Sequence, residues 1–194
     1  MGNREPPADF GVCARPIFGV AMPSLPQTWS PLPVSALPAE LAGFDRWVLC
    51  GGYSVAILTG ADTRSHGDTD IGVFRSDLEN CLRVLGLSRV YLCRSGTHVT
   101  WDGGKVAPEV HDIWVTSRDG RFWSLQVMVF DDDGDDVVYR RDPRLRWPKR
   151  VHSRIIDGIP VLNPFVTFLF KANKTKQETK ELHDLRRLIE LGGK

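Results

Sequence analysis

The sequence predicts an α/β (α+β) protein in which a small mixed sheet is flanked by helices and followed by a short helical tail. Three features of the chain predict this class. Compact apolar runs of strand length end at glycine or begin next to aspartate. Apolar residues at helical spacing follow such runs, and the chain from about residue 163 carries two helical patterns with no strand pattern between them.

The composition is that of one soluble globular domain. The chain has 194 residues, 42% of them hydrophobic, and 25 Lys and Arg residues nearly balance 24 Asp and Glu residues. A net charge of +1 provides no overall field for a polyanion, so we expect no nucleic-acid partner unless a local basic patch supplies one. No apolar stretch approaches the roughly 20 residues of a membrane span, and the first residues lack the apolar core of a secretory signal. We therefore expect a cytoplasmic protein with no membrane contact.

The beginning of the chain differs in composition from the rest. Eight of the 13 prolines lie within the first 38 residues, where they interrupt helices and strand ladders. We therefore predict an irregular, Pro-rich extension over residues 1–28 and one domain over residues 29–194, with the helical tail beginning at about residue 163.

The first half of the predicted domain alternates helices and buried strands. Gly51 and Gly52 predict a tight turn where the first strand meets a helix, and Gly60 predicts the end of that helix. The polar residues that follow lead into a run that alternates and then becomes apolar, as a strand with one functional end would. The expected elements are a short helix at 38–43, a strand at 46–50, a helix at 53–58 and a strand at 68–74.

The second half predicts a further helix, a hairpin and the helical tail. Asp77 is placed to cap the helix that follows it. Two runs rich in Val, Ile, Phe and Trp, at 110–115 and 122–130, flank a loop of hairpin composition and are expected to pair. The helix after Asp77 is expected to bury one face, formed by Leu78, Cys81, Leu82 and Leu85. A second helix is expected from Asn163 to about Lys171. A third is expected at 179–191, with an apolar stripe that packs on the core: Leu182, Leu185, Leu188 and Ile189.

Two aspartates at the start of the 68–74 strand carry the main functional signal. Three D-x-D pairs occur in the chain, but the other two lie in the acidic run 131–136, which is typical of a solvated turn. Residues i and i+2 of a strand point to the same side, about 6.6 Å apart, so the carboxylates of Asp68 and Asp70 are expected to face one pocket. Paired acids are tolerated best with cations between them, such as two Mg²⁺ ions that also bind the phosphates of a nucleotide.

The segment before these aspartates has what phosphate groups require. The Gly51-Gly52 turn that enters a helix permits close backbone approach and offers free N–H groups at the positive end of the helix. Arg64 suits either a carboxylate or a phosphate. His66 suits a loop hydrogen bond as well as a catalytic role. The glycine turn and the two aspartates together are the parts of a metal-assisted phosphoryl-transfer site.

The chain resembles the nucleotidyltransferase superfamily, and in particular its aminoglycoside and lincosamide nucleotidyltransferase-like branch. The likeness rests on residues 47–77, with the Gly-Gly pair and the pattern R-x-H-x-D-x-D, and extends over about 29–190. It implies a nucleotidyltransferase-like fold and an enzyme that moves a nucleoside monophosphate from an NTP, with ATP expected, to a hydroxyl of a small-molecule acceptor and releases pyrophosphate. The roles it implies are nucleotide-phosphate binding by Gly51, Gly52 and Ser54, bracing of the metal loop or phosphate contact by Arg64 and His66, and catalytic Mg²⁺ binding by Asp68 and Asp70.

The chain departs from the pattern of the superfamily at the position of its third acidic residue. A third acidic residue usually serves there as metal ligand or as base for the acceptor hydroxyl, and this chain has neutral Gln126 in its place. We take Asp112, on the adjacent predicted strand, as the third catalytic carboxylate, and Asp131 is the other candidate.

Two further functions remain open. A nucleotide-binding or regulatory relative that has lost catalysis would act through a protein or RNA partner, and the neutral Gln126 favours this alternative. RNA binding would instead use the basic segment 140–154, although the same residues would also balance the acidic run 131–136.

Overall fold

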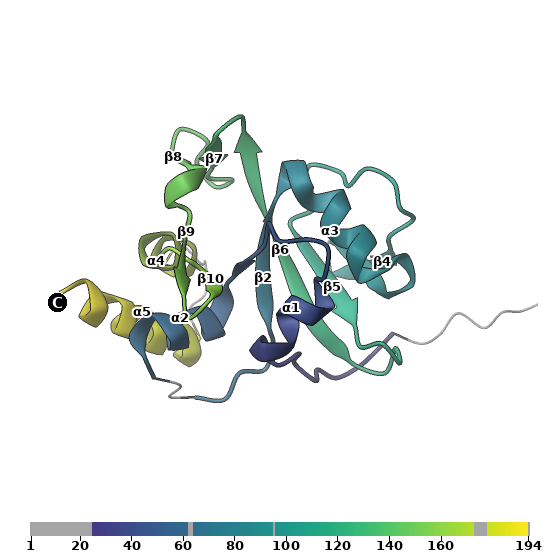
Figure 1. Cartoon of the computed structure of the whole chain (residues 1–194), viewed down its shortest axis with the longest axis horizontal. Coiled ribbons are helices and arrows are strands. Elements are labelled where there is room, and N and C mark those ends of the chain that lie inside the picture. Colours follow the sequence, from purple (N-terminus) through teal and green to yellow (C-terminus); the bar gives the residue numbers. More distant parts are fainter. Residues whose placement is uncertain (1–24, 62–63, 95, 173–177, 194) are drawn as a thin grey trace, which may run out of the picture.

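The computed structural model describes residues 25–61, 64–94, 96–172 and 178–193 (Figure 1). Within these ranges the chain forms a ten-stranded mixed sheet and five α-helices, so the predicted α/β class is confirmed. Residues 1–24 of the predicted extension lie outside the described residues. Thr28 and Trp29 already join the domain, since the Thr28 carbonyl accepts a hydrogen bond from the Trp123 amide at 3.0 Å and Trp29 forms a parallel bridge to Trp123.

The sheet brings together segments that are far apart in the sequence. Its strands are β1 (Val48–Leu49), β2 (Asp70–Phe74), β3 (Val90–Arg94), β4 (Thr97–Thr100), β5 (Asp112–Thr116), β6 (Trp123–Asp133), β7 (Asp136–Val138), β8 (Arg146–Pro148), β9 (Ser153–Ile156) and β10 (Ile159–Leu162). Their order is β4-β3-β5-β6-β2-β1-β10-β9, with β7 and β8 attached to the far end of β6. β2 is parallel to β6, and β1 is parallel to β10. The remaining pairs are antiparallel, including the expected hairpin of β5 and β6.

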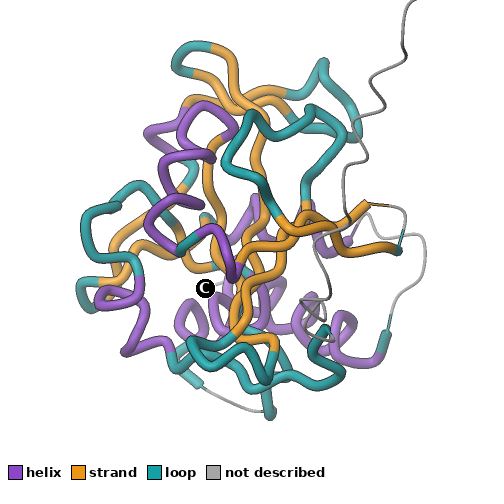
Figure 2. The backbone as a smooth tube through the Cα atoms, turned by 90° about the vertical axis from the view of Figure 1, so that its right-hand side faces the viewer, coloured by secondary structure: helices purple, strands orange, loops and turns teal. Residues whose placement is uncertain are grey.

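The helices cover the sheet in two groups. They are α1 (Leu37–Glu40), α2 (Gly51–Thr59), α3 (Leu78–Leu85), α4 (Pro164–Ala172) and α5 (Thr179–Gly192). α1 and α3 share the main core with β2, β3, β5 and β6. α2, α4 and α5 contact one another near β10, and in the turned view of Figure 2 the strands cross the middle of the molecule with helices on more than one side. None of the helices in the described ranges has both the length and the apolar character needed to cross a membrane.

The helix after Asp77 confirms the periodicity argument and corrects the capping argument. All four apolar residues predicted for its inner face, Leu78, Cys81, Leu82 and Leu85, are at most 2% exposed. Asp77 stands at the N-cap, but its side chain makes no capping hydrogen bond. Its carboxylate instead pairs with Arg46 at 2.9 Å, because the charged guanidinium is the stronger partner.

The predicted leucine stripe of the last helix is wrong. Leu182 and Ile189 are 56% and 63% exposed, and Leu188 is the member of the stripe that is buried. The inner face of α5 instead carries Glu181 and Asp184, each 2% exposed. Asp184 forms ion pairs with Arg64 and Lys171, and these pairs turn the face of α5 that carries Asp184 toward the rest of the protein.

The acidic run is not simply a solvated turn. β6 continues through Asp133, and the turn itself is formed by Gly134 and Asp135. Lys149 binds Asp132 at 2.6 Å and Arg146 binds Asp133 at 2.9 Å. These cations neutralise the acids and permit the ladder to extend into β7, as the charge-balance interpretation of the basic segment expects.

Candidate active site

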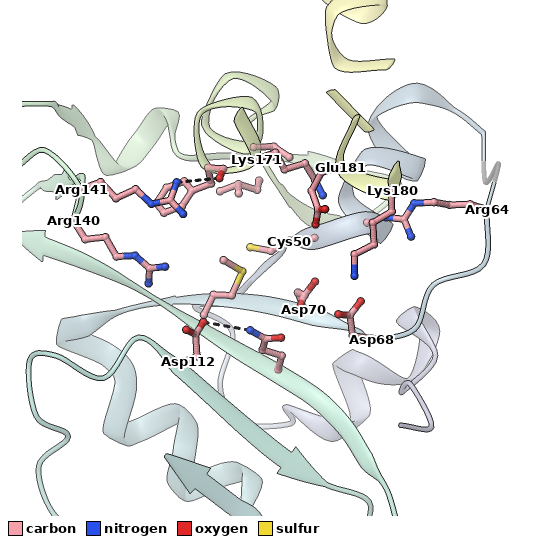
Figure 3. A pocket seen from close by; sticks show the side chains of 17 residues that line it. Cys50, Arg64, Asp68, Asp70, Asp112, Arg140, Arg141, Lys171, Lys180 and Glu181 are labelled. Carbon is pink, nitrogen blue, oxygen red and sulfur yellow. Dashed lines mark hydrogen bonds between the residues drawn. The ribbon is translucent and has the colours of Figure 1, made fainter. Parts of the chain in front are cut away.

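A cavity of about 290 Å³ lies where α2 and β2 begin, with α4 and α5 on its other side (Figure 3). Six of the eight predicted site residues line it: Gly51, Gly52, Arg64, Asp68, Asp70 and Asp112. Ser54 and His66 do not line it. Cys50 and Met128 are among its less polar lining residues, and burial together with the charge of Asp70 raises the pKa of the Cys50 thiol well above its usual value.

The two predicted carboxylates face this cavity together. Asp70 is the first residue of β2 and is 9% exposed, while Asp68 is partly exposed two residues earlier. Thr69 points away between them, and its hydroxyl donates a hydrogen bond to the Leu32 carbonyl at 2.7 Å. The alternation of a strand therefore places both acids on one side, and Figure 3 shows them adjacent in the cavity.

The start of α2 lies directly against Asp70. The Cys50 amide donates to the Asp70 carbonyl at 2.9 Å, which continues the ladder of β1 with β2. Gly51 follows with a φ of 65°, and a Cβ at this position would overlap the Asp70 carboxylate. A Cβ at Gly52 would likewise overlap the Arg64 guanidinium. Because α2 begins at Gly51, the two glycines form the first turn of the helix and not a separate turn before it. Only residues without a Cβ leave room here for the Asp70 and Arg64 side chains.

Ser54 and His66 support this turn from outside the cavity. Ser54 is 0% exposed, and its hydroxyl donates to the Gly51 carbonyl at 2.8 Å. The His66 ring contacts Tyr53 in a tilted arrangement, with the ring centroids 4.1 Å apart, and lies beneath Gly52. Both residues are therefore placed to stabilise the glycine turn rather than to meet a ligand in the cavity.

One buried carboxylate joins three elements at the edge of the cavity. Asp184 of α5 accepts hydrogen bonds from Arg64 at 3.2 Å (Nε) and 2.8 Å (Nη2) and from Lys171 of α4 at 2.8 Å. Burial opposes ionisation of Asp184, but the hydrogen bonds from Arg64 and Lys171 outweigh it and lower the pKa of the carboxyl. The same hydrogen bond raises the pKa of Arg64. Arg64 thus braces the loop before β2 against α5, which the same Asp184 joins to α4 through Lys171, while Arg64 also lines the cavity.

Gln126 lies between Asp70 and Asp112. It pairs in register with Asp70 across β2 and β6, while Asp112 on β5 pairs with Met128. The Gln126 amide donates to the Asp112 carboxylate at 3.3 Å. Two strand spacings separate Asp112 from Asp70, which is about 10 Å across the sheet. Asp112 faces the same cavity, but from its opposite side.

Asp131 is not the third carboxylate of this site. It accepts hydrogen bonds from Arg75 at 3.0 Å and from His111 at 2.8 Å, and it does not line the cavity. The suggestion that it replaces the missing acid is therefore wrong, because two cationic or polar partners already hold it elsewhere on β6.

Five charged residues of the cavity were given no site role by sequence reasoning: Arg140, Arg141, Lys171, Lys180 and Glu181. Lys171 and the Lys180-Glu181 pair lie in segments that resemble the nucleotidyltransferases, which is the signal that could have identified them. The two arginines belong to the basic segment 140–154 and also to the segment Tyr139-Arg140-Arg141, which shares that resemblance, so the same signal could have identified them.

The donor set fits Mg²⁺ bound together with a nucleotide. Over the ranges that the structure describes, no three His, Cys, Asp or Glu side chains gather closely enough to hold a metal ion alone. Mg²⁺ typically takes one or two protein carboxylates and completes its shell with water and substrate phosphate. Asp68 and Asp70 provide such a pair, beside a helix start that Gly51 leaves unobstructed.

The chain matches no protein-family model and no curated protein. Among solved structures it is similar to the lincosamide antibiotic adenylyltransferase LnuA, lincomycin-bound, with a TM-score of 0.49 and 16% identity over 75% of this chain and 86% of that chain. It is also similar to ANT(2")-Ia in complex with adenylyl-2"-tobramycin, with a TM-score of 0.42 and 15% identity over 74% of this chain and 78% of that chain. Both are of the branch that the sequence resembles. At these values the likeness does not decide the activity, which depends on the residues of this chain.

Proposed function

We propose that this chain is a Mg²⁺-dependent nucleotidyltransferase, which moves a nucleoside monophosphate from an NTP, with ATP as the expected donor, to a hydroxyl of a small acceptor. The observation that carries the proposal is the Asp70 carboxylate, which lies against the backbone of Gly51 and faces the same cavity as Asp68. Two carboxylates beside the start of a helix combine ligands for cations and for phosphate oxygens in one place.

The α2 side of the cavity suits the triphosphate. The first N–H groups of a helix have no partner within it and lie at the positive end of its dipole. Arg64 and Lys180 line the cavity, and Lys180 extends toward the aspartate pair in Figure 3. These groups would hold the β- and γ-phosphates and stabilise the departing pyrophosphate.

Asp68 and Asp70 would hold the metal. When bound, Mg²⁺ neutralises charge on the phosphates and makes the α-phosphorus more electrophilic. The two carboxylates are oriented for this by Thr69, which turns to the other side of the strand, and by the ladder bond between Cys50 and Asp70.

Asp112 is the cavity carboxylate that remains for the acceptor, since Glu181 caps the start of α5 by accepting the Glu178 amide at 3.0 Å. The Gln126 amide holds it on the side of the cavity away from α2. From there it would accept the proton of the acceptor hydroxyl as the hydroxyl oxygen bonds to the α-phosphorus and the bond to pyrophosphate breaks.

The direct test measures pyrophosphate release and transfer of an α-phosphate label to a panel of hydroxyl compounds, with Mg²⁺ and with a chelator. We expect Asp68→Asn and Asp70→Asn each to lower turnover by at least about 100-fold, because each removes a charge that stabilises the transition state. Asp133→Asn is the matched control, since this carboxylate is exposed on the distant β6–β7 hairpin. Folded Asp68→Asn protein with wild-type turnover would refute the assignment.

The second candidate function is nucleotide binding without turnover. The observation that favours it is the neutral Gln126 between Asp70 and Asp112, which leaves two carboxylates on one side and one on the other. Calorimetry would then show Mg²⁺-dependent binding of ATP or GTP that Asp68→Asn abolishes, while no acceptor becomes labelled and no pyrophosphate is released.

A further inference from the structure

The strand order gives the cavity two distinct sides. Across the sheet the order is β1, β2, β6 and β5, with neighbouring strands about 4.8 Å apart. Gly51 follows β1, Asp70 begins β2, Gln126 lies on β6 and Asp112 lies on β5. The glycine turn and Asp112 therefore lie on opposite sides of the aspartate pair.

The chemistry of the proposed function assigns the acceptor to the Asp112 side. In phosphoryl transfer the attacking and leaving oxygens lie roughly in line on opposite sides of the phosphorus. Pyrophosphate held at the start of α2 leaves toward β1, so the acceptor hydroxyl approaches from the direction of β5. Asp112 is the carboxylate on that side.

Two arginines lie next along the same path. One face of β6 carries every second residue, here Gln126, Met128 and Phe130. Asp112 on β5 pairs with Met128 of this face. Phe130 contacts Phe170 at a centroid distance of 5.3 Å. Arg140 and Arg141 cover that Phe170 ring at 5.9 Å and 5.7 Å, and both line the cavity. Figure 3 shows them on the side where Asp112 lies.

In the described part of the chain, no carboxylate neutralises the charges of these two arginines, whereas three nearby cations are each paired with an aspartate. Among the described residues, neither guanidinium forms an ion pair with a carboxylate, although Arg141 also donates to the Phe170 carbonyl at 3.2 Å. Three other cations of the same basic segment are paired: Arg144 with Asp142, Arg146 with Asp133 and Lys149 with Asp132. Arg150 and Arg154 of the same segment also have no ion pair among the described residues, but neither lines the cavity.

We propose that the acceptor carries an anionic group, a phosphate or a carboxylate, which Arg140 and Arg141 bind while Asp112 meets the neighbouring hydroxyl. This inference rests on the proposed function and specifies its substrate class. A guanidinium fixed on an aromatic ring presents parallel N–H donors to two oxygens of such an anion. A polycationic acceptor would meet two positive charges and one carboxylate here, which is an unfavourable match.

Binding of an anionic probe tests the site without turnover. Calorimetry would measure glycerol 3-phosphate, glucose 6-phosphate and glucuronate, each against its uncharged parent compound, on protein saturated with Mg²⁺ and α,β-methylene ATP. We expect at least one anion to bind in addition to the nucleotide analogue and at least about tenfold more tightly than its parent, as charged hydrogen bonds allow. Arg140→Gln should remove this preference and leave the affinity for the analogue unchanged, whereas the exposed, ion-paired Arg144→Gln should change neither.

Three results would overturn the inference: no probe binds, each parent binds as well as its anion, or Arg140→Gln weakens the nucleotide analogue instead. Transfer of an α-phosphate label to the same compounds separates this inference from the proposed function. Labelling that does not distinguish anion from parent leaves the nucleotidyltransferase proposal intact and refutes the anion site. Anion binding that depends on Arg140, with no labelling of any compound, supports the anion site and counts against transferase activity.

Discussion

The ion triad around Asp184 leads to a stability prediction for the substitution Asp184→Asn. The residue is 2% exposed, and its carboxylate lies 2.8 Å from both Arg64 Nη2 and Lys171 Nζ. At an effective dielectric constant of about 20, each cation attracts the carboxylate by roughly 6 kcal/mol before the cost of desolvation is subtracted. The amide keeps the shape of the side chain but leaves two cations without a counter-charge, and breaking such a buried site costs about 3–5 kcal/mol.

Denaturant and thermal unfolding measure this loss. We expect Asp184→Asn to lower the free energy of unfolding by about 3 kcal/mol and the Tm by about 6–12 °C for a domain of this size. The exposed pair of Asp133 with Arg146 supplies the control, because Asp133→Asn should cost less than about 1 kcal/mol.

The pH dependence identifies the charge as the cause. The pKa of Asp184 is lowered in the folded chain, so its contribution is complete above the unfolded value of about 4 and is lost as the pH falls through the folded value. The difference between wild type and Asp184→Asn should therefore shrink at low pH. If the two proteins unfold within about 0.5 kcal/mol of each other at pH 7, the triad does not hold the C-terminal helices to the loop.

Three other substitutions, one of them with a matched control, test the site and the core. Gly51→Ala should abolish Mg-nucleotide binding in calorimetry, because the new Cβ overlaps Asp70, whereas Gly60→Ala, also at positive φ but in open space, should cost about 1 kcal/mol of stability and leave binding unchanged. Gln126→Glu should tighten Mg²⁺ binding and raise turnover if the missing acid limits the site, and weaker Mg²⁺ binding would contradict this. Burial lowers the pKa of His152 to about 4 from 6.5, so the free energy of unfolding should fall by up to roughly 3 kcal/mol between pH 6.5 and pH 4, and His152→Gln should remove that slope in urea titrations.

Local patterns predicted the elements whose burial has a simple period. The four apolar residues of α3 and the pairing of β5 with β6 follow from helical spacing and from alternation over one hairpin. β9 and β10 were not expected, since β10 becomes a strand by lying parallel to β1, far away in the sequence. The face of α5 was predicted wrongly because hydrophobic spacing competes there with the ion pairs of Asp184, which no local pattern records.

The residues of the candidate site fall into the same two groups, those that local patterns predicted and those that only tertiary contacts place. The sequence by itself determined that Asp68 and Asp70 share one side of a strand and that two glycines lie where a strand meets a helix, because strand alternation and the absence of a Cβ are properties of neighbouring residues. Only the tertiary structure decided that Asp112 stands two strands away from Asp70 and that Arg140 and Arg141 join the cavity. Strand order and long-range ion pairing set those positions, and both depend on contacts between segments that the chain brings together only when it folds.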